Sequence, residues 1–121
     1  MGRIHTFLLL AALACALAGC GNQPTPEQLR ADSEHAEAKG ALAHADSRAA
    51  RAHLFAALTL DDPLNRRARV AEETRMLGDL DAAGARPDSA FFWYARSQAE
   101  FRGLADRNGA RDITLRVAAL H

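Results

Sequence analysis

The stretch from Glu27 to Leu60 constrains the fold of this chain more than any other part of the sequence. It is rich in alanine, contains no proline and has one glycine, Gly40. Alanine has the highest intrinsic helix propensity, and proline is the strongest helix breaker. The stretch therefore predicts helix.

Capping signals define where this helical stretch begins and where it can divide. Thr25 is expected as the N-cap, with Pro26 at the first helical position and Gln28 completing a capping box. The polar segment His44–Arg48 interrupts the pattern. It either continues one long helix or separates two helices, with Asp46 or Ser47 as the second cap.

Small residues recur at spacings of three and four along this stretch and are expected to line one face. They are Ala38, Ala41, Ala45, Ala49, Ala52 and Ala56. Because alanine buries little area, larger side chains must supply most of the hydrophobic stabilisation, at about 25 cal/mol per Å². These are Leu42, Leu54, Phe55 and Leu58.

A third helix is expected to begin at Asp62-Pro63, which repeats the order of cap and proline, and to run through about Leu80. Its apolar side comprises Val70, Met76, Leu77 and Leu80. Gly84 suits a left-handed helix end, and Pro87 cannot continue a helix. A break is therefore expected between residues 81 and 89.

The last long helix is expected from Ala90 to about Arg107, with Asp88 or Ser89 as its cap and Asn108-Gly109 as its stop. The tail after it alternates like a strand, yet its apolar residues also fit a helix. A single strand would have no partner, so helix is favoured for the tail. The predicted fold class is all-α, a small bundle of helical hairpins over residues 26–121.

Part of the chain resembles the tetratricopeptide family, whose repeat spans about 34 residues. Leu77-Gly78 matches the Leu-Gly pair of the first helix, and Ala90-x3-Tyr94-x2-Ser97 matches the small and aromatic positions of the second. Residues 56–63, "AALTLDDP", resemble the end of a preceding repeat but carry one extra residue before the proline. The resemblance covers residues 37–102 at most and implies possible tetratricopeptide-like hairpins.

The beginning of the chain has the three-part layout of an export signal. Arg3 precedes an uncharged apolar run from Phe7 to Ala18, which is followed by small residues. The run is shorter than the roughly 20 residues that a transmembrane helix needs. A cleaved signal is therefore favoured over a transmembrane anchor.

At Leu17-Ala18-Gly19-Cys20 the sequence resembles the lipobox of bacterial lipoproteins. The resemblance implies that Cys20 takes a diacylglycerol, that the chain is cut before it, and that the new amine is acylated. Residues 1–19 would be the signal peptide, 20–25 a lipidated tether and 26–121 the helical domain. Two or more acyl chains anchor a protein stably. Gly21, where an inner-membrane lipoprotein tends to have Asp, favours the outer membrane, facing the periplasm.

Charge and cysteine content narrow the function further. The chain has 15 basic and 15 acidic residues, so no electrostatic argument supports nucleic-acid binding. Its two cysteines are Cys15, which leaves with the signal, and Cys20, which carries lipid. The mature domain is therefore expected to contain no disulfide and no thiolate metal site.

Four consecutive aromatic residues begin at Phe91. Successive helical residues are about 100° apart, so these four cannot share one face. Phe91, Tyr94 and Phe101 lie on one stripe and are expected in the core, whereas Phe92 and Trp93 point elsewhere. Either neighbouring helices cover both sides, or Phe92 and Trp93 form a partner-binding or membrane-interface surface, since exposed aromatic patches commonly mark contacts.

The other polar side chains fit solvated helix faces. His35, His44 and His53 are nine residues apart, which places neighbours on opposite sides of a helix, so no metal site is expected. Charged residues four apart predict local ion pairs. The expected pairs are Arg30 with Glu34, Asp62 with Arg66, Arg69 with Glu73, Arg96 with Glu100, and Arg102 with Asp106.

No catalytic constellation stands out in the sequence, so a non-enzyme without cofactor or metal is expected. The favoured function is a membrane-anchored, non-catalytic helical module for protein interaction or envelope assembly. It would be held to the bilayer through acylated Cys20 and would bind a protein partner in the envelope. Two alternatives remain: an accessory, exclusion or immunity lipoprotein of a secretion or conjugation system, and an inhibitor of an envelope hydrolase.

Overall fold

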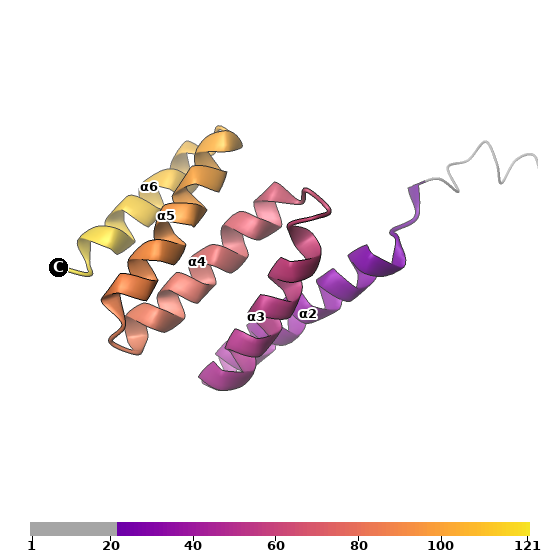
Figure 1. Cartoon of the computed structure of the whole chain (residues 1–121), viewed down its shortest axis with the longest axis horizontal. Coiled ribbons are helices and arrows are strands. Elements are labelled where there is room, and N and C mark those ends of the chain that lie inside the picture. The colour runs from indigo at the N-terminus through magenta and orange to yellow at the C-terminus, as the bar shows by residue number, and fades with distance from the viewer. Residues whose placement is uncertain (1–21) are drawn as a thin grey trace, which may run out of the picture.

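The computed structural model describes residues 22–121, which form five α-helices and no strand. The helices are α2 (Pro26–Ala43), α3 (Ser47–Asp61), α4 (Arg67–Ala83), α5 (Pro87–Gly103) and α6 (Arg107–Ala118). They follow one another in chain order across Figure 1. The predicted signal, lipobox and start of the tether lie outside the described residues.

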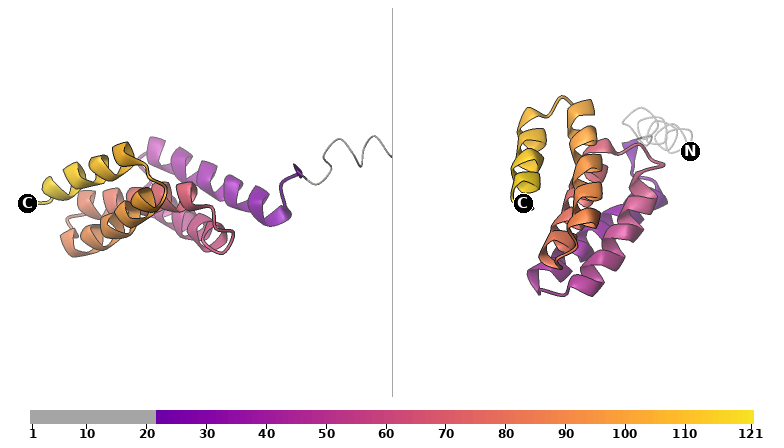
Figure 2. Two further views of the ribbon diagram at one scale, coloured as in Figure 1. Left: turned by 90° about the horizontal axis from the view of Figure 1, so that it is seen from above. Right: turned by 60° about the vertical axis from the view of Figure 1, so that its left-hand side comes forward.

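The helices pack as consecutive antiparallel neighbours. Helices α2 and α3 form one hairpin, α4 and α5 form a second, and α6 packs on α5. Figure 2 shows α2 and α6 on one side of the molecule, with α3 and α5 on the other. The predicted all-α bundle of helical hairpins is confirmed.

The four turns between these helices repeat one backbone geometry every 20 residues. One residue in each has a positive φ of 55–57°: Ala45, Asn65, Ala85 and Ala105. The following N–H closes the turn by donating to the carbonyl five residues earlier, as from Asp46 to Ala41 at 2.9 Å and from Asp106 to Phe101 at 2.9 Å. The hairpin unit is therefore 40 residues long, compared with about 34 in tetratricopeptide repeats.

Two of the predicted caps are confirmed. Thr25 and Gln28 form the reciprocal capping box at the start of α2. Asp46 accepts from the Ala49 N–H at 3.0 Å, so the segment 44–48 does separate two helices. The prediction of helix for the tail is also confirmed, by α6.

Two predicted boundaries are wrong, and Gly84 ends α4 as predicted but without the left-handed conformation. Asp62-Pro63 lies in the turn before α4 rather than at its start, because the Arg66 N–H closes this turn on the Asp61 carbonyl at 3.1 Å. Gly84 has a φ of −82°, and its neighbour Ala85 takes the left-handed conformation. Asn108-Gly109 begins α6 instead of ending α5, because Asp106 accepts from the Gly109 N–H at 2.9 Å.

The main core lies where the two hairpins meet. It contains Leu54 and Leu58 of α3 and the predicted apolar side of α4, namely Val70, Met76, Leu77 and Leu80. A second cluster of Ala90, Tyr94 and Ile113 joins α5 to α6. Phe55, expected in the core, is 41% exposed because α3 turns it outward toward Trp93.

Tyr94 shows how closely α5 approaches α4. A Cβ at Gly78 would lie 2.5 Å from the Tyr94 ring, so the ring occupies space that only glycine leaves free. The Tyr94 hydroxyl donates to Asp79 at 2.6 Å. Burial, together with this carboxylate, raises the pKa of Tyr94 to about 12.

Candidate functional site

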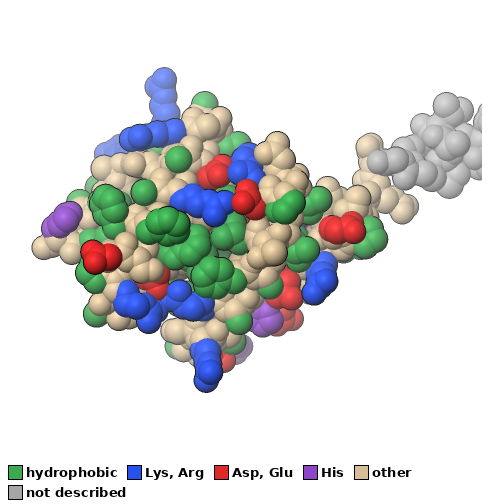
Figure 3. Space-filling view, in the orientation of Figure 1, with side chains coloured by type: hydrophobic (Ala, Val, Ile, Leu, Met, Phe, Trp, Pro, Cys, Tyr) green, Lys and Arg blue, Asp and Glu red, His purple; other side chains and the backbone are tan. Residues whose placement is uncertain are grey.

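The two predicted partner-binding residues, Phe92 and Trp93, lie with Phe55 in one aromatic cluster on α3 and α5. The edge-to-face centroid distances are 5.6 Å between Phe55 and Trp93 and 5.0 Å between Phe92 and Trp93. Hydrophobic side chains gather at the centre of the face drawn in Figure 3, in the orientation that shows α3 and α5 in front. We call Phe55, Phe92 and Trp93 the aromatic surface.

The members of the aromatic surface differ in exposure. Phe92 is 60% exposed, whereas Trp93 is half-buried and packs against the main core. Helix α3 therefore covers one side of Trp93, whereas most of the Phe92 side chain is exposed within the part of the chain that the structure describes. Trp93 packs against the core on one side and contacts the more exposed rings of Phe55 and Phe92 on the other.

Phe91 departs from its prediction. It is 52% exposed instead of buried, and it lines a hollow with Thr114 and Val117 of α6. Tyr94 is buried as expected, and Phe101 is half-buried against Ile113 and its neighbours. The four aromatic side chains therefore point in different directions. Tyr94 packs on α4, Trp93 packs against α3, Phe92 faces solvent and Phe91 lies toward α6.

Ion pairs between helices border the aromatic surface. Asp62, after α3, accepts from Arg96 of α5 at 2.8 Å and from Arg67 of α4 at 2.6 Å. The hydrogen bond from Arg67 is the main reason that the pKa of Asp62 is lowered. Arg67 also binds Glu100 at 2.9 Å. These pairs connect three helices around the aromatic cluster.

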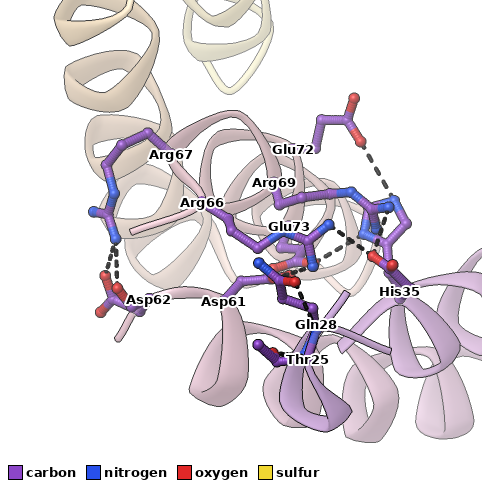
Figure 4. Close-up of polar contacts among 11 residues, drawn as sticks. Thr25, Gln28, His35, Asp61, Asp62, Arg66, Arg67, Arg69, Glu72 and Glu73 are labelled. Carbon is purple, nitrogen blue, oxygen red and sulfur yellow. Dashed lines mark hydrogen bonds and ion pairs between the residues drawn. The ribbon is translucent and has the colours of Figure 1, made fainter. Parts of the chain in front are cut away.

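A buried polar cluster lies where α2 and the turn after α3 meet α4 (Figure 4). His35 Nδ1 lies 2.8 Å from a Glu73 carboxylate oxygen, and its Nε2 lies 3.4 Å from Glu72. Arg66 bridges Asp32 at 2.7 Å and Asp61 at 3.0 Å. Glu73 and Asp61 have no exposed surface.

Glu73 and Asp61 each bury a carboxyl oxygen that has no hydrogen-bond partner within the described residues. Glu73 Oε1 and Asp61 Oδ2 are both buried without a donor if both groups are ionised. Burial, and then the hydrogen bond with Asp61, raises the pKa of Glu73 to about 7, while His35 opposes this shift. The raised pKa favours the protonated form of Glu73 inside the fold. The carboxyls of Glu73 and Asp61 have no exposed surface and lie among the contacts that join α2, α4 and the turn after α3.

None of the five predicted local ion pairs is formed, and several of their members instead pair with residues of other helices. Glu34 binds His53 at 2.6 Å, and Arg69 binds Asp32 at 3.0 Å. Asp106 caps α6 instead of binding Arg102. The expectation that His35 is solvated is wrong as well, since it is 6% exposed. Within residues 22–121, no three His, Cys, Asp or Glu side chains are placed to hold a metal ion.

Sequence reasoning missed the buried acids of the turns. Asp61 accepts from Arg66, and Asp81 accepts from Arg86 at 3.1 Å, each five residues later. Arg51 and Ser89 also donate to Asp81. The repeated spacing Asp-x4-Arg is a signal that could have identified both turns.

Searches of the whole chain against protein-family models, curated protein sequences and solved structures find no match. None of the helices described between residues 22 and 121 is both long enough and apolar enough to cross a membrane.

Proposed function

We propose that the protein is a membrane-anchored bacterial lipoprotein whose helical domain is a non-catalytic module for protein interaction or envelope assembly. The observation that carries this proposal is the aromatic surface, in which two exposed phenylalanines flank a tryptophan fixed against the core. Rigid, partly buried aromatics provide large contact areas at low entropic cost and are enriched at binding hot spots.

The lipobox supports the anchoring part of the proposal. An acylated Cys20 would hold the domain close to a bilayer, because α2 begins at Pro26, only a few residues later. With Gly21 following the cysteine, the proposed location is the periplasmic side of the outer membrane.

The proposed non-catalytic role is supported by the surroundings of Glu73. A buried carboxyl with a raised pKa is a common feature of acid and base catalysts. Glu73 has this property, but its carboxyl is occupied by His35 and Asp61 and has no exposed surface. The Glu73 carboxyl therefore takes part in contacts between helices rather than in a surface site.

The anchor is tested by the intact mass of the membrane-extracted protein beside a Cys20→Ala variant. The expected mass is that of an acylated chain beginning at Cys20, with the variant uncleaved and unmodified. An unmodified mass for the native protein would remove the lipoprotein assignment.

The aromatic surface is tested by site-specific photo-crosslinking in cells from position 92, with position 29 as the control. Leu29 of α2 is comparably exposed, at 55% against 60% for Phe92, but lies outside the aromatic surface. A discrete protein adduct from position 92 alone is expected, and Phe55→Ala should reduce its yield. Equal adducts from both positions would contradict a role for this surface.

A further inference from the structure

The repeating turns make two parts of the molecule equivalent. Because the hairpin unit is 40 residues long, the α3–α4 pair corresponds to the α5–α6 pair. Helix α5 covers the first pair. None of the helices described in residues 22–121 covers the second pair in the same way.

The covered pair shows what a docked helix requires. Trp93 of α5 packs on the main core beside Phe55, and the Ser97 hydroxyl donates to the Ala71 carbonyl at 2.7 Å. Two ion pairs flank these contacts: Arg96 with Asp62 at 2.8 Å and Glu100 with Arg67 at 2.9 Å.

The positions 40 residues later lie open. Thr74 and Leu77 are buried beneath α5, whereas Thr114 is exposed and Val117 is half-buried. A hollow of about 280 Å³ opens there between α5 and α6. Its lining residues are Phe91, Ala95, Gln98, Arg102, Thr114 and Val117, which we call the terminal groove.

The charged residues at the terminal groove differ from those at the equivalent positions of the covered pair. This difference indicates which kind of helix would bind there. Arg102 stands where the covered pair has Asp62, and Arg107 stands where it has Arg67. Neither arginine has an ion-pair partner within the described chain, although both line a second hollow of about 350 Å³ with Asp106. The Asp106 carboxylate is directed to the Gly109 N–H. The side chains of Arg102 and Arg107 are therefore available to pair with acidic residues of a bound helix.

We infer that the terminal groove binds an acidic amphipathic helix of another protein, in the position that α5 takes on α3 and α4. The docked helix would carry an aromatic residue equivalent to Trp93, an acid three residues later facing Arg102, and an acid seven residues later facing Arg107. This inference rests on the proposed interaction function and adds the chemistry of a partner and a second contact site.

A second copy of this chain does not supply that helix. The two required acids are four residues apart, and no two acidic residues in the sequence have this spacing. Helix α5 itself has Arg96 at the first of these positions and Glu100 at the second. The pattern therefore points to a different protein.

The probe is a labelled peptide of residues 87–103 with the change Arg96→Glu, and its control is the peptide of native sequence. Binding to the full-length lipoprotein in detergent micelles is measured by fluorescence anisotropy. We expect the Arg96→Glu peptide to bind at least about fivefold more tightly, because one partly exposed ion pair replaces a repulsion. The native peptide would place Arg96 beside Arg102.

Charge reversal on the protein completes the test. Arg102→Glu should reverse the preference between the two peptides, whereas Arg48→Glu, at an exposed arginine of α3, should leave it unchanged. Circular dichroism checks that the variants remain folded. Equal affinity of the two peptides, or the same loss with Arg48→Glu, would overturn the inference.

The two contact sites can fail separately. Peptide binding that is lost in Phe92→Ala but kept in Arg102→Glu would exclude the terminal groove and leave the aromatic surface intact. Reversal by Arg102→Glu, together with equal crosslinking from positions 92 and 29, would support the groove and contradict the proposed role of the aromatic surface.

Discussion

The surface of α3 and α4 and the surface of α5 and α6 have the same backbone geometry but different cover. Beneath α5, position 77 is a buried leucine and position 62 an ion-paired aspartate. At the open pair, the corresponding residues are half-buried Val117 and unpaired Arg102. The turns set the position of each helix, whereas the neighbouring helix decides which side chains are buried.

The largest expected effect comes from truncating matched residues on the two surfaces. Leu77→Ala should lower the free energy of unfolding by about 2–5 kcal/mol, because it leaves a cavity in the main core. Val117→Ala, at the half-buried equivalent, should cost about 1 kcal/mol or less. Urea unfolding followed by circular dichroism measures both, and equal losses would contradict the assignment of one surface as covered and the other as open.

The close approach of α5 to α4 is tested by Gly78→Ala. The added methyl would overlap the buried Tyr94 ring and should lower the free energy of unfolding by about 2 kcal/mol. Gly40→Ala is the control, because no atom lies within 4 Å of its added Cβ. That change should raise stability by about 0.5–1 kcal/mol through helix propensity. If Gly78→Ala left the free energy of unfolding unchanged, the close packing of the Tyr94 ring of α5 on Gly78 of α4 would be contradicted.

The contacts of α4 with its two inner neighbours differ in their pH dependence. Helix α4 meets α6 through Arg116 and Asp79 at 2.6 Å, and meets α2 through the buried Glu73. Burial raises the folded-state pKa of Glu73 to about 7, above the ordinary value of 4.5 for a glutamate. The folded state therefore binds more protons between these values, and the Glu73 contribution to stability falls as pH rises through 7.

Glu73→Gln tests this dependence, since an amide imitates the protonated acid toward both His35 and Asp61. The native protein should lose about 1–2 kcal/mol of stability between pH 5 and pH 8 relative to this variant. Glu72→Gln, at the exposed neighbour of His35, should keep the native slope. If Glu73→Gln kept the same slope as the native protein, the raised pKa of Glu73 would be excluded.

The smallest expected effect concerns the charges beside α5. Asp62→Ala should cost about 0.5–1 kcal/mol, because its ion pairs with Arg67 and Arg96 are partly exposed. Arg102→Ala at the equivalent open position should change stability by a few tenths of a kcal/mol at most. Unfolding in low and high salt separates the two variants, since only the Asp62 loss should shrink as salt rises.

The sequence was sufficient for features with local causes. Alanine content, the absence of proline and the caps at Thr25 and Asp46 predict helices and a break from residues a few positions apart. The prediction for the turn after α3 is wrong because Asp62-Pro63 has the cap-and-proline pattern that is typical of a helix start. The buried acid of Asp61, bound by Arg66 five residues later, determines that turn instead.

The candidate sites depend on distant residues and were only partly predictable. Glu73 follows Arg69 at the spacing of a solvated pair, yet its partner His35 lies 38 residues earlier in sequence. Four consecutive aromatics require that some face away from one core, which pointed correctly to exposure of Phe92. Whether Phe91 or Trp93 is more deeply buried depends on where α3 and α6 pack. The sequence around these two residues does not predict that packing.

Amide hydrogen exchange of α4 and α6 tests the central claim most directly. We predict that amides of α4 exchange only through global unfolding, whereas those of residues 110–117 in α6 exchange through local opening at a lower free energy. Adding the residue 87–103 peptide with Arg96→Glu should then slow exchange in α6 and leave α4 unchanged. Equal protection of both helices in the free protein, with no effect of the peptide, would contradict the account of an open terminal groove.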